Sequence, residues 1–348
     1  MRFNDTFIKG CLKQQIDHVP VWYMRQAGRY QPDYREIRKK YTLLEICHIP
    51  ELCAEVTISP VQQLGVDAAI LFSDIMVPLG PMGVKFDIIE KRGPVLESPY
   101  RTAADIESLR DLSPEEDLPH VMETIKILAR ELKVPLIGFS GAPFTLASYM
   151  VEGGPSRNYI RTKQLMYSHP DVWNRLMDKL GTMVITYLKA QVQAGAQALQ
   201  IFDSWVGALS PDDYRVYVYP TMKRIFDELK SVPAPKIYFG VGSGELLPLW
   251  SDLNTDVIGL DWRVSITEGR RRIGERYAVQ GNLDPTLLLA PWPVLEAKAK
   301  EIIDQGISQP GFVFNLGHGI FPEVPGEMLR RLTDYIHEYS KTALEQRL

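Results

Sequence analysis

The sequence is poor in the residues and runs that mark several large classes of protein. Only three of its 348 residues are cysteines, Cys11, Cys47 and Cys53, and all three lie in the first sixth of the chain. That is too few for the disulfide framework of a small secreted protein. No apolar run approaches the roughly 18 residues of a membrane span, and the opening MRFNDTFIKG lacks the apolar centre of a signal peptide. These absences predict a reduced, cytoplasmic protein.

The chain also lacks a basic excess. Lysine and arginine total 39 against 43 aspartate and glutamate residues, which gives a formal charge of −4. A general nucleic-acid binder needs many cationic phosphate contacts, so we expect no nucleic-acid partner. A few arginines gathered in one cleft can still bind an acidic small molecule, because local charge can oppose net charge.

Motifs for common cofactors are missing. No Gly-Lys dipeptide occurs, which excludes a P-loop, and Gly240–Glu245 has glutamate where the third glycine of a dinucleotide fingerprint belongs. No lysine ends a predicted strand, which disfavours a Schiff base. His48 lies near two cysteines, but no thiol exists beyond Cys53 to complete a metal site. We therefore expect neither a cofactor nor a catalytic metal.

Short β-branched or aromatic runs recur through the whole chain. We expect eight strands, at Val19–Tyr23, Val66–Phe72, Val134–Phe139, Ala198–Phe202, Ile237–Val241, Val257–Leu260, Tyr277–Val279 and Phe312–Phe314. Most are continuously apolar, which is typical of parallel strands covered on both faces.

Helical periodicity fills the segments between these strands. The clearest cases are Leu118–Lys133, a run from Val172 that stops at Gly195, Pro211–Leu229 and a C-terminal helix from near Pro325. The alternation predicts a single (β/α)8 TIM-type barrel domain over residues 1–348, with extra N-terminal helices. A doubly wound open sheet is the alternative.

The active site of such a barrel lies at the carboxyl ends of its strands. Polar side chains gather just beyond several of the predicted ends, although loops are polar in any protein. Those of interest are Arg25, Arg29, Asp74, Tyr149, Ser204 and His318. The remaining histidines fall in predicted loops or helices, where we expect structural or solvated roles: His18, His48, His120, His169 and His337.

Arg25 and Arg29 are four residues apart. If this segment begins a helical turn, both guanidinium groups project from one face and are spaced to bind two carboxylates. Ion pairs with nearby glutamates would explain the pair equally well.

Asp74 ends an apolar strand, and His318 stands between two glycines after the last strand. A carboxylate like that of Asp74 can stabilise a developing cation or act as an acid, but a plain helix N-cap is common there. The two glycines let the backbone approach a ligand next to His318, which could otherwise be structural.

Eight segments, in order, resemble the uroporphyrinogen decarboxylase family. They are PVWYMRQAGRY (20–30), FSDIM (72–76), GFSGAPFT (138–145), YMVEGG (149–154), QIFDSW (200–205), GLDW (259–262), QGNLDP (280–285) and NLGHG (315–319). The first is long and specific, and the resemblance covers nearly the whole chain.

The resemblance implies a cofactor-independent enzyme, commonly a homodimer, that converts the four acetate side chains of uroporphyrinogen III to methyls in haem synthesis. It implies that Arg25 and Arg29 bind substrate carboxylates and that Asp74 binds the pyrrole N–H groups. Tyr149, Ser204 and His318 would contact carboxylates or support the pocket. Gln26, Ala27 and Gly28 would line it.

Two other functions fit parts of this pattern. A corrinoid-dependent methyltransferase of the same superfamily would need a zinc ion held by histidine and cysteine at strand ends, and the thiols are missing. A porphyrin carrier could keep the pocket without the chemistry, but the full set of presumed reactive residues is present.

Overall fold

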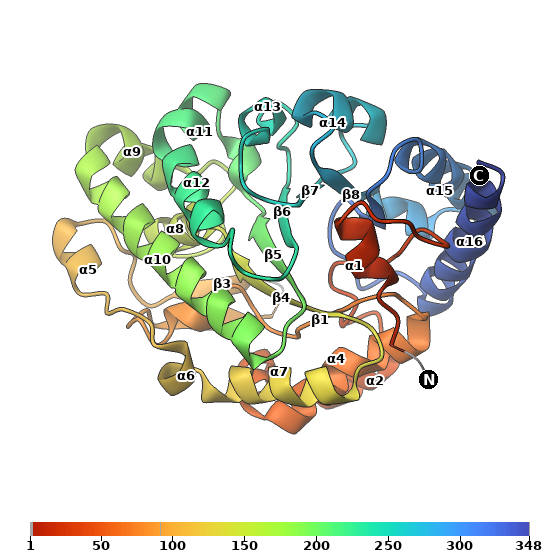
Figure 1. The fold of residues 1–348 in the computed structure, drawn as a ribbon. Helices are drawn as coiled ribbons and strands as arrows, with labels where there is room; N and C mark the ends of the chain where they lie inside the picture. The colour runs from red at the N-terminus through yellow and green to blue at the C-terminus, as the bar shows by residue number, and fades with distance from the viewer. Residues whose placement is uncertain (1–2, 91, 348) are drawn as a thin grey trace.

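The protein is described by a computed structural model that covers residues 3–90 and 92–347. Its centre is a curled sheet of parallel strands enclosed by helices (Figure 1). In sheet order the strands are β1 (Ala69–Ile70), β4 (Leu136–Gly141), β5 (Ala198–Asp203), β6 (Lys236–Gly240), β7 (Val257–Gly259), β8 (Ala278–Leu283) and β9 (Phe312–Leu316). Nearly all their residues are buried, as expected for strands with helices outside and side chains inside.

The predicted first strand closes this sheet into a barrel. Val21 forms a parallel bridge to Phe314 of β9, and its carbonyl accepts a hydrogen bond of 2.8 Å from the N–H of Asp67, just before β1. Val19–Tyr23 therefore occupies the eighth strand position. It remains a single bridge, partly because Pro20 has no N–H to donate. The closure confirms a TIM-type barrel and rules out the doubly wound open sheet.

Helices form the outer layer. They are α1 (Thr6–Cys11), α2 (Pro32–Arg38), α3 (Leu43–His48), α4 (Pro50–Leu64), α5 (Ala103–Glu107), α6 (Pro114–Asp117), α7 (Pro119–Glu131), α8 (Pro143–Glu152), α9 (Ile160–Ser168), α10 (Pro170–Ala194), α11 (Pro211–Tyr217), α12 (Tyr219–Glu228), α13 (Leu247–Trp250), α14 (Ile266–Ile273), α15 (Trp292–Gly306) and α16 (Gly326–Glu345). Within the described ranges none of them combines the length and the apolar character that crossing a bilayer would take.

One predicted helix is divided in two, and one hairpin was missed. The segment Pro211–Leu229 is two helices, because Pro220 lacks the N–H that would continue α11 and the residues before a proline avoid helical geometry. An antiparallel hairpin, β2 (Phe86–Ile89) with β3 (Gly93–Leu96), was also not expected. Its strands are short and only partly buried, so they lack the apolar runs that mark the barrel strands.

Candidate active site

The predicted site residues follow the carboxyl ends of several barrel strands. Asp74 comes after β1, Ser204 after β5 and His318 after β9, while Tyr149 lies on α8 after β4. Arg25 lies in the turn after Val21, close enough for its positive charge to shift the pKa of Asp74, Tyr149 and His318. Four of the predicted residues therefore share one electrostatic environment.

The arginine segment is a series of turns and not the helical turn considered from sequence. Arg25 has φ near 63°, and its side chain lies against Gly319, where a Cβ atom would stand 2.4 Å from Cδ of Arg25. Arg25 and Arg29 are both exposed, and neither has a side-chain hydrogen bond or ion pair within residues 3–90 and 92–347. The alternative of structural ion pairs is therefore wrong.

The two arginines do not reach the same groups. The charge of Arg29 lowers the pKa of Tyr34, although burial has the larger effect and raises it overall. The ring of Tyr34 contacts Phe72, two residues before Asp74. Arg29 thus flanks the site, whereas Arg25 faces it.

The side chain of Gln26 is hydrogen-bonded inside the protein. Its side chain is fully buried, donates to the Ala68 carbonyl at 3.1 Å and accepts from the N–H of Tyr23 at 3.1 Å. Its carbonyl accepts from the hydroxyl of Tyr30. Ala27 and Gly28 of the same loop are partly buried, and the lining of the pocket by Gln26, Ala27 and Gly28 stays a prediction.

One carboxylate oxygen of Asp74 is hydrogen-bonded within the turn that follows β1. Its Oδ1 accepts the N–H of Met76 at 2.9 Å, so the N-cap alternative accounts for one carboxylate oxygen. Nothing among the described residues donates to Oδ2 or forms an ion pair with the carboxylate within 4 Å. Burial raises the pKa of Asp74, while the Met76 N–H and the charge of Arg25 oppose that rise.

Trp205 follows Ser204 in the chain and packs against Tyr149. The Tyr149 ring stacks on Trp205 at 3.9 Å between centroids, and neither hydroxyl has a hydrogen-bond partner in the described part of the chain. Burial is the main cause of the raised pKa of Tyr149, and the charge of Asp74 adds to it. Both hydroxyls are therefore neutral and free to donate to a ligand.

His318 is a neutral hydrogen-bond donor. The backbone N–H of Gly319 donates to its Nδ1 at 2.8 Å, so in the neutral ring the proton sits on Nε2. Burial, followed by the charges of Arg25 and Arg263, lowers the pKa of His318 to about 4. At neutral pH the residue can donate a hydrogen bond from Nε2 but carries no charge.

A buried carboxyl supports this site and could not be recognised from the sequence. Asp203 accepts from Thr145 at 2.7 Å and from Tyr238 at 2.8 Å, and Thr145 accepts in turn from the N–H of Trp205. Burial raises the pKa of Asp203 to about 6, against these hydrogen bonds. The network fixes the loop that carries Ser204. The QIFDSW segment contains Asp203, but its partners come from other strands and helices.

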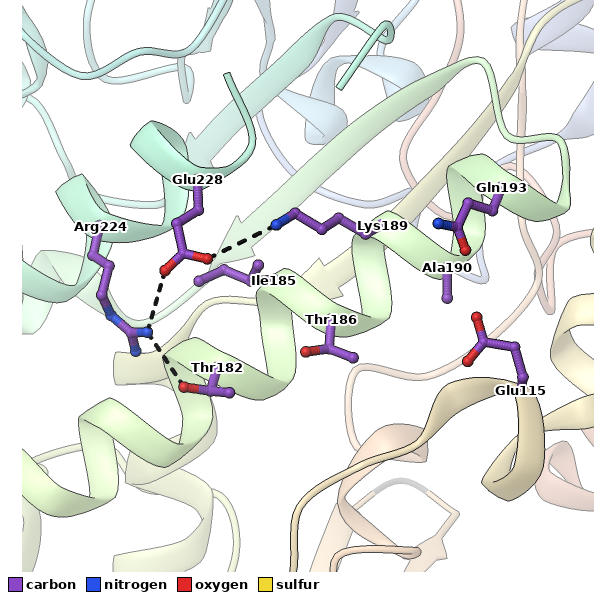
Figure 2. A pocket seen from close by; sticks show the side chains of 9 residues that line it. All are labelled: Glu115, Thr182, Ile185, Thr186, Lys189, Ala190, Gln193, Arg224 and Glu228. Carbon is purple, nitrogen blue, oxygen red and sulfur yellow. Dashed lines mark hydrogen bonds and ion pairs between the residues drawn. The ribbon is translucent and has the colours of Figure 1, made fainter. Parts of the chain in front are cut away.

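A cavity of about 340 Å³ lies on the outer helical layer, away from the strand ends. Figure 2 shows it between α10 and α12, with Glu115 at its edge. Arg224 and Lys189 both pair with Glu228, at 3.6 and 3.8 Å. Because its cations are already neutralised, we assign this cavity no part in the chemistry.

Residues that could hold a metal do not gather at the strand ends. The three cysteines are buried and free. Within the described ranges, the one group of three potential ligands is His18, Asp67 and His337, which lies at the opposite end of β1 from Asp74. The zinc site of a methyltransferase therefore has no counterpart around Asp74 in the part of the chain that the structure describes.

Comparison with known proteins gives one consistent family. The family model "Uroporphyrinogen decarboxylase (URO-D)" matches residues 2–339. The curated uroporphyrinogen decarboxylases of Bacillus pumilus and Bacillus subtilis are each 60% identical to this chain, over 97% of it and 96% of their own lengths. That of Halalkalibacterium halodurans is 59% identical over 97% of this chain and 98% of its own.

Solved structures support the fold alone. A methyltransferase from Methanosarcina mazei superposes with a TM-score of 0.81 at 24% identity, covering 97% of this chain and 99% of its own. A B12-independent methionine synthase from Shewanella reaches 0.55 at 11% identity, covering 89% of this chain and 91% of its own. These similarities agree with the barrel.

Proposed function

The chain belongs to the uroporphyrinogen decarboxylase family, and from that membership we propose that it converts all four acetate side chains of uroporphyrinogen III to methyls. The products are coproporphyrinogen III and four molecules of CO2, formed without a cofactor. As a family member the protein is a carboxy-lyase of tetrapyrrole biosynthesis, acting on uroporphyrinogen. The reaction takes place among the side chains around Asp74.

The observation that supports this proposal most is the position of Arg25. Among the described residues, the guanidinium of Arg25 has no side-chain hydrogen bond and no ion pair within 4 Å. Its charge nevertheless acts on Asp74, Tyr149 and His318. The substrate carries eight carboxylates, so it supplies the anion that such a group lacks. Arg25 binds one carboxylate at the site, and Arg29 binds another at its flank.

Decarboxylation of a pyrrole acetate needs an acceptor for the electron pair of the breaking C–C bond. Protonation of the ring at its α-carbon gives an iminium-like cation, which takes up that pair as CO2 leaves. Protonation of the resulting exocyclic carbon and loss of the ring proton then yield the methylpyrrole. The substrate itself thus provides the electron sink that a cofactor supplies elsewhere.

Asp74 stabilises the cationic state. Its free Oδ2 accepts the pyrrole N–H groups, and its carboxylate faces the positive charge that develops on the ring. The attraction between carboxylate and ring is stronger in the transition state than in the neutral substrate, so it accelerates the chemical step.

Neutral donors complete the binding of the remaining carboxylates. Nε2–H of His318 and the hydroxyls of Tyr149 and Ser204 have no partner in the described part of the protein. The ring proton comes from Asp74, an arginine or a water molecule. With a pKa near 4, His318 is not the donor at neutral pH.

We also propose that the protein is a cytoplasmic homodimer, as the family resemblance implies. Its three thiols are reduced and buried, which suits a reducing compartment. Light scattering on the purified chain should give twice the mass of 39.6 kDa; a monomer mass would refute the dimer but leave the activity proposal intact.

Anaerobic turnover tests the function directly. Purified protein incubated with uroporphyrinogen should release CO2 and produce seven-, six-, five- and finally four-carboxylate products in sequence. Binding without CO2 release would indicate a carrier and overturn the enzymatic proposal.

A further inference from the structure

A second set of chemically active side chains lies at the amino end of β1, remote from the site. Asp67 is 2% exposed, with Nε2 of His18 3.1 Å from its Oδ1 and Nε2 of His337 2.8 Å from its Oδ2. The two imidazole rings meet edge to face with centroids 4.4 Å apart. Both rings are partly exposed, at 23% and 27%. An ion in solvent can therefore reach them.

The contacts of Asp67 put a carboxylate acceptor at the centre of the group. Nε2 of each imidazole lies at hydrogen-bond distance from one of its oxygens. The side-chain amide of Asn4 donates to Oδ1 at 2.9 Å and the N–H of Val21 donates to Oδ2 at 2.8 Å, so both oxygens are also held from the rest of the protein.

We propose that His18, Asp67 and His337 form a site for a divalent transition-metal ion of the zinc type. The three ligand atoms lie within 4.8 Å of one another. Zinc binds imidazole nitrogen and carboxylate oxygen at about 2.0–2.2 Å with tetrahedral angles, which requires ligand atoms roughly 3.3 Å apart. The separations of 2.8 Å from His337 to Oδ2 and of 3.1 Å from His18 to Oδ1 are close to that value, so either oxygen of Asp67 can serve as the third ligand atom, and water completes the tetrahedron.

Binding changes no oxidation state. The ion takes the place of the Nε2 proton on each imidazole, that proton passes to solvent or to Nδ1 of the same ring, and Nδ1 carries the proton that remains. Asp67 stays ionised, and its bonds to Asn4 and Val21 become the outer-shell contacts that orient a ligating carboxylate.

An ion bound at this site would cross-link the segments that close the barrel. His18 precedes the closing segment at Val21, Asp67 precedes β1, and His337 lies on α16 near the end of the chain. One ion would tie these three segments together. The sequence alone predicts structural roles for both histidines because 319 positions separate them.

The experiment uses the full-length protein, stripped of metal with a chelator and titrated with Zn²⁺ against a fluorescent zinc indicator. We expect one ion per chain and a higher thermal midpoint with Zn²⁺, whereas millimolar Mg²⁺ should have no effect because it prefers oxygen ligands. His18→Gln and His337→Gln, which keep an N–H donor toward Asp67, should each weaken binding at least about tenfold.

His48→Gln is the matched control. His48 stacks on His120 with centroids 4.3 Å apart but belongs to no group of three ligands in the described residues, so zinc binding should not change. Equal binding by the unsubstituted protein and the His18→Gln/His337→Gln double variant would overturn the proposal.

Nitrogen NMR of the unsubstituted chain gives a second readout that depends on no variant. On adding Zn²⁺, Nε2 of His18 and of His337 should carry no proton, and Nδ1 should carry the proton that remains. A proton retained on Nε2 in both rings would also overturn the site. Neither outcome bears on uroporphyrinogen turnover, which takes place at the other end of the barrel.

Discussion

Gly319 makes room for Arg25, the arginine that faces the proposed active site. A Cβ atom there would lie 2.4–2.9 Å from Cδ, Cγ and Nε of Arg25, so Gly319→Ala should displace that side chain. A hydrogen bond to a charged group is worth about 1.5–3 kcal/mol, so we expect KM for uroporphyrinogen to rise about 10- to 100-fold, with a smaller change in kcat. Gly326→Ala is the control, because its Cβ would meet nothing closer than 3.6 Å. Equal KM values in the two variants would contradict the role of Arg25.

Asp74 is the residue whose charge the proposed mechanism needs. Asp74→Asn keeps the size and an acceptor oxygen for the Met76 N–H but removes the negative charge. Losing a preorganised charge-stabilising group costs about 3 kcal/mol or more in the barrier, so kcat should fall at least about 100-fold. Single-turnover measurements under anaerobic conditions separate this effect from product release. Near-normal turnover would exclude Asp74 from charge stabilisation.

His318 should remain neutral across the range in which an ordinary histidine titrates. Its pKa is lowered to about 4 from the usual 6.5, so between these values the unfolded chain binds more protons than the folded one. The contribution of His318 to stability therefore falls as pH drops from about 6.5 to about 4. NMR titration should show Nε2–H retained at pH 5.5, and His318→Gln should make the acid loss of stability shallower. A pKa of His318 near 6.5 in this titration would contradict the burial of its ring.

Only part of this site could be predicted at the residue level. Arg25, Asp74 and His318 stand next to strand ends in the sequence, so the barrel rule alone brings them together. The role of Gln26 could not be inferred, because its amide meets the carbonyl of Ala68, 42 positions away. Asp203 was hidden for the same reason, since Tyr238 comes from the next strand.

The junction of β1, β4 and α10 shows how one element completes another. β1 ends at Ile70, so the groups of Phe139 on β4 that face it have no strand partner. The buried amide of Gln191 on α10 replaces the strand, accepting from the Phe139 N–H at 2.8 Å and donating to its carbonyl at 2.9 Å.

Gln191→Ala should leave both groups of Phe139 unpaired. Each unsatisfied buried group costs about 1–3 kcal/mol, so we expect the two together to lower the free energy of unfolding by about 2–6 kcal/mol. Urea denaturation measures this loss. Gln193→Ala, two positions along the same helix and exposed, should change stability little. Equal losses in the two variants would mean that α10 itself, and not the amide pairing, carries the effect.

Among the elements, long apolar strands were predictable and their exceptions were not. The predicted runs at 134–139, 198–202 and 237–241 correspond closely to β4, β5 and β6, because burial on both faces requires uninterrupted apolar residues. The hairpin β2–β3 is exposed on alternate residues of β2 and carries no such signal. The predicted run 66–72 shrinks to Ala69–Ile70, because its ends bond to Val21 and Thr57.

At the scale of the whole molecule, the barrel depends on how its first and last segments meet. Val21 lies between β9 and the start of β1, and its N–H donates to Oδ2 of Asp67. The same carboxylate contacts Asn4, His18 and His337. One buried anion therefore connects the N-terminal segment, the closing segment and α16. The closure rests on side-chain contacts to Asp67 as much as on strand pairing.

Asp67→Asn should accordingly destabilise the entire fold. The amide cannot carry the charge, and its NH2 group would face a donor, so we expect a loss of about 3 kcal/mol at pH 7, measured by urea denaturation with EDTA present. The pKa of Asp67 is held below its ordinary value, so its stabilisation is complete above about pH 4 and is lost as pH falls through the folded pKa. The difference in unfolding free energy between the unsubstituted protein and Asp67→Asn should thus persist at pH 5 and disappear only in stronger acid. Asp17→Asn changes an exposed carboxylate nearby in the sequence, so its unfolding free energy should equal that of the unsubstituted protein at every pH. If the difference for Asp67→Asn stayed constant down to pH 2, the shape of the Asp67 side chain, and not its charge, would hold the barrel closed.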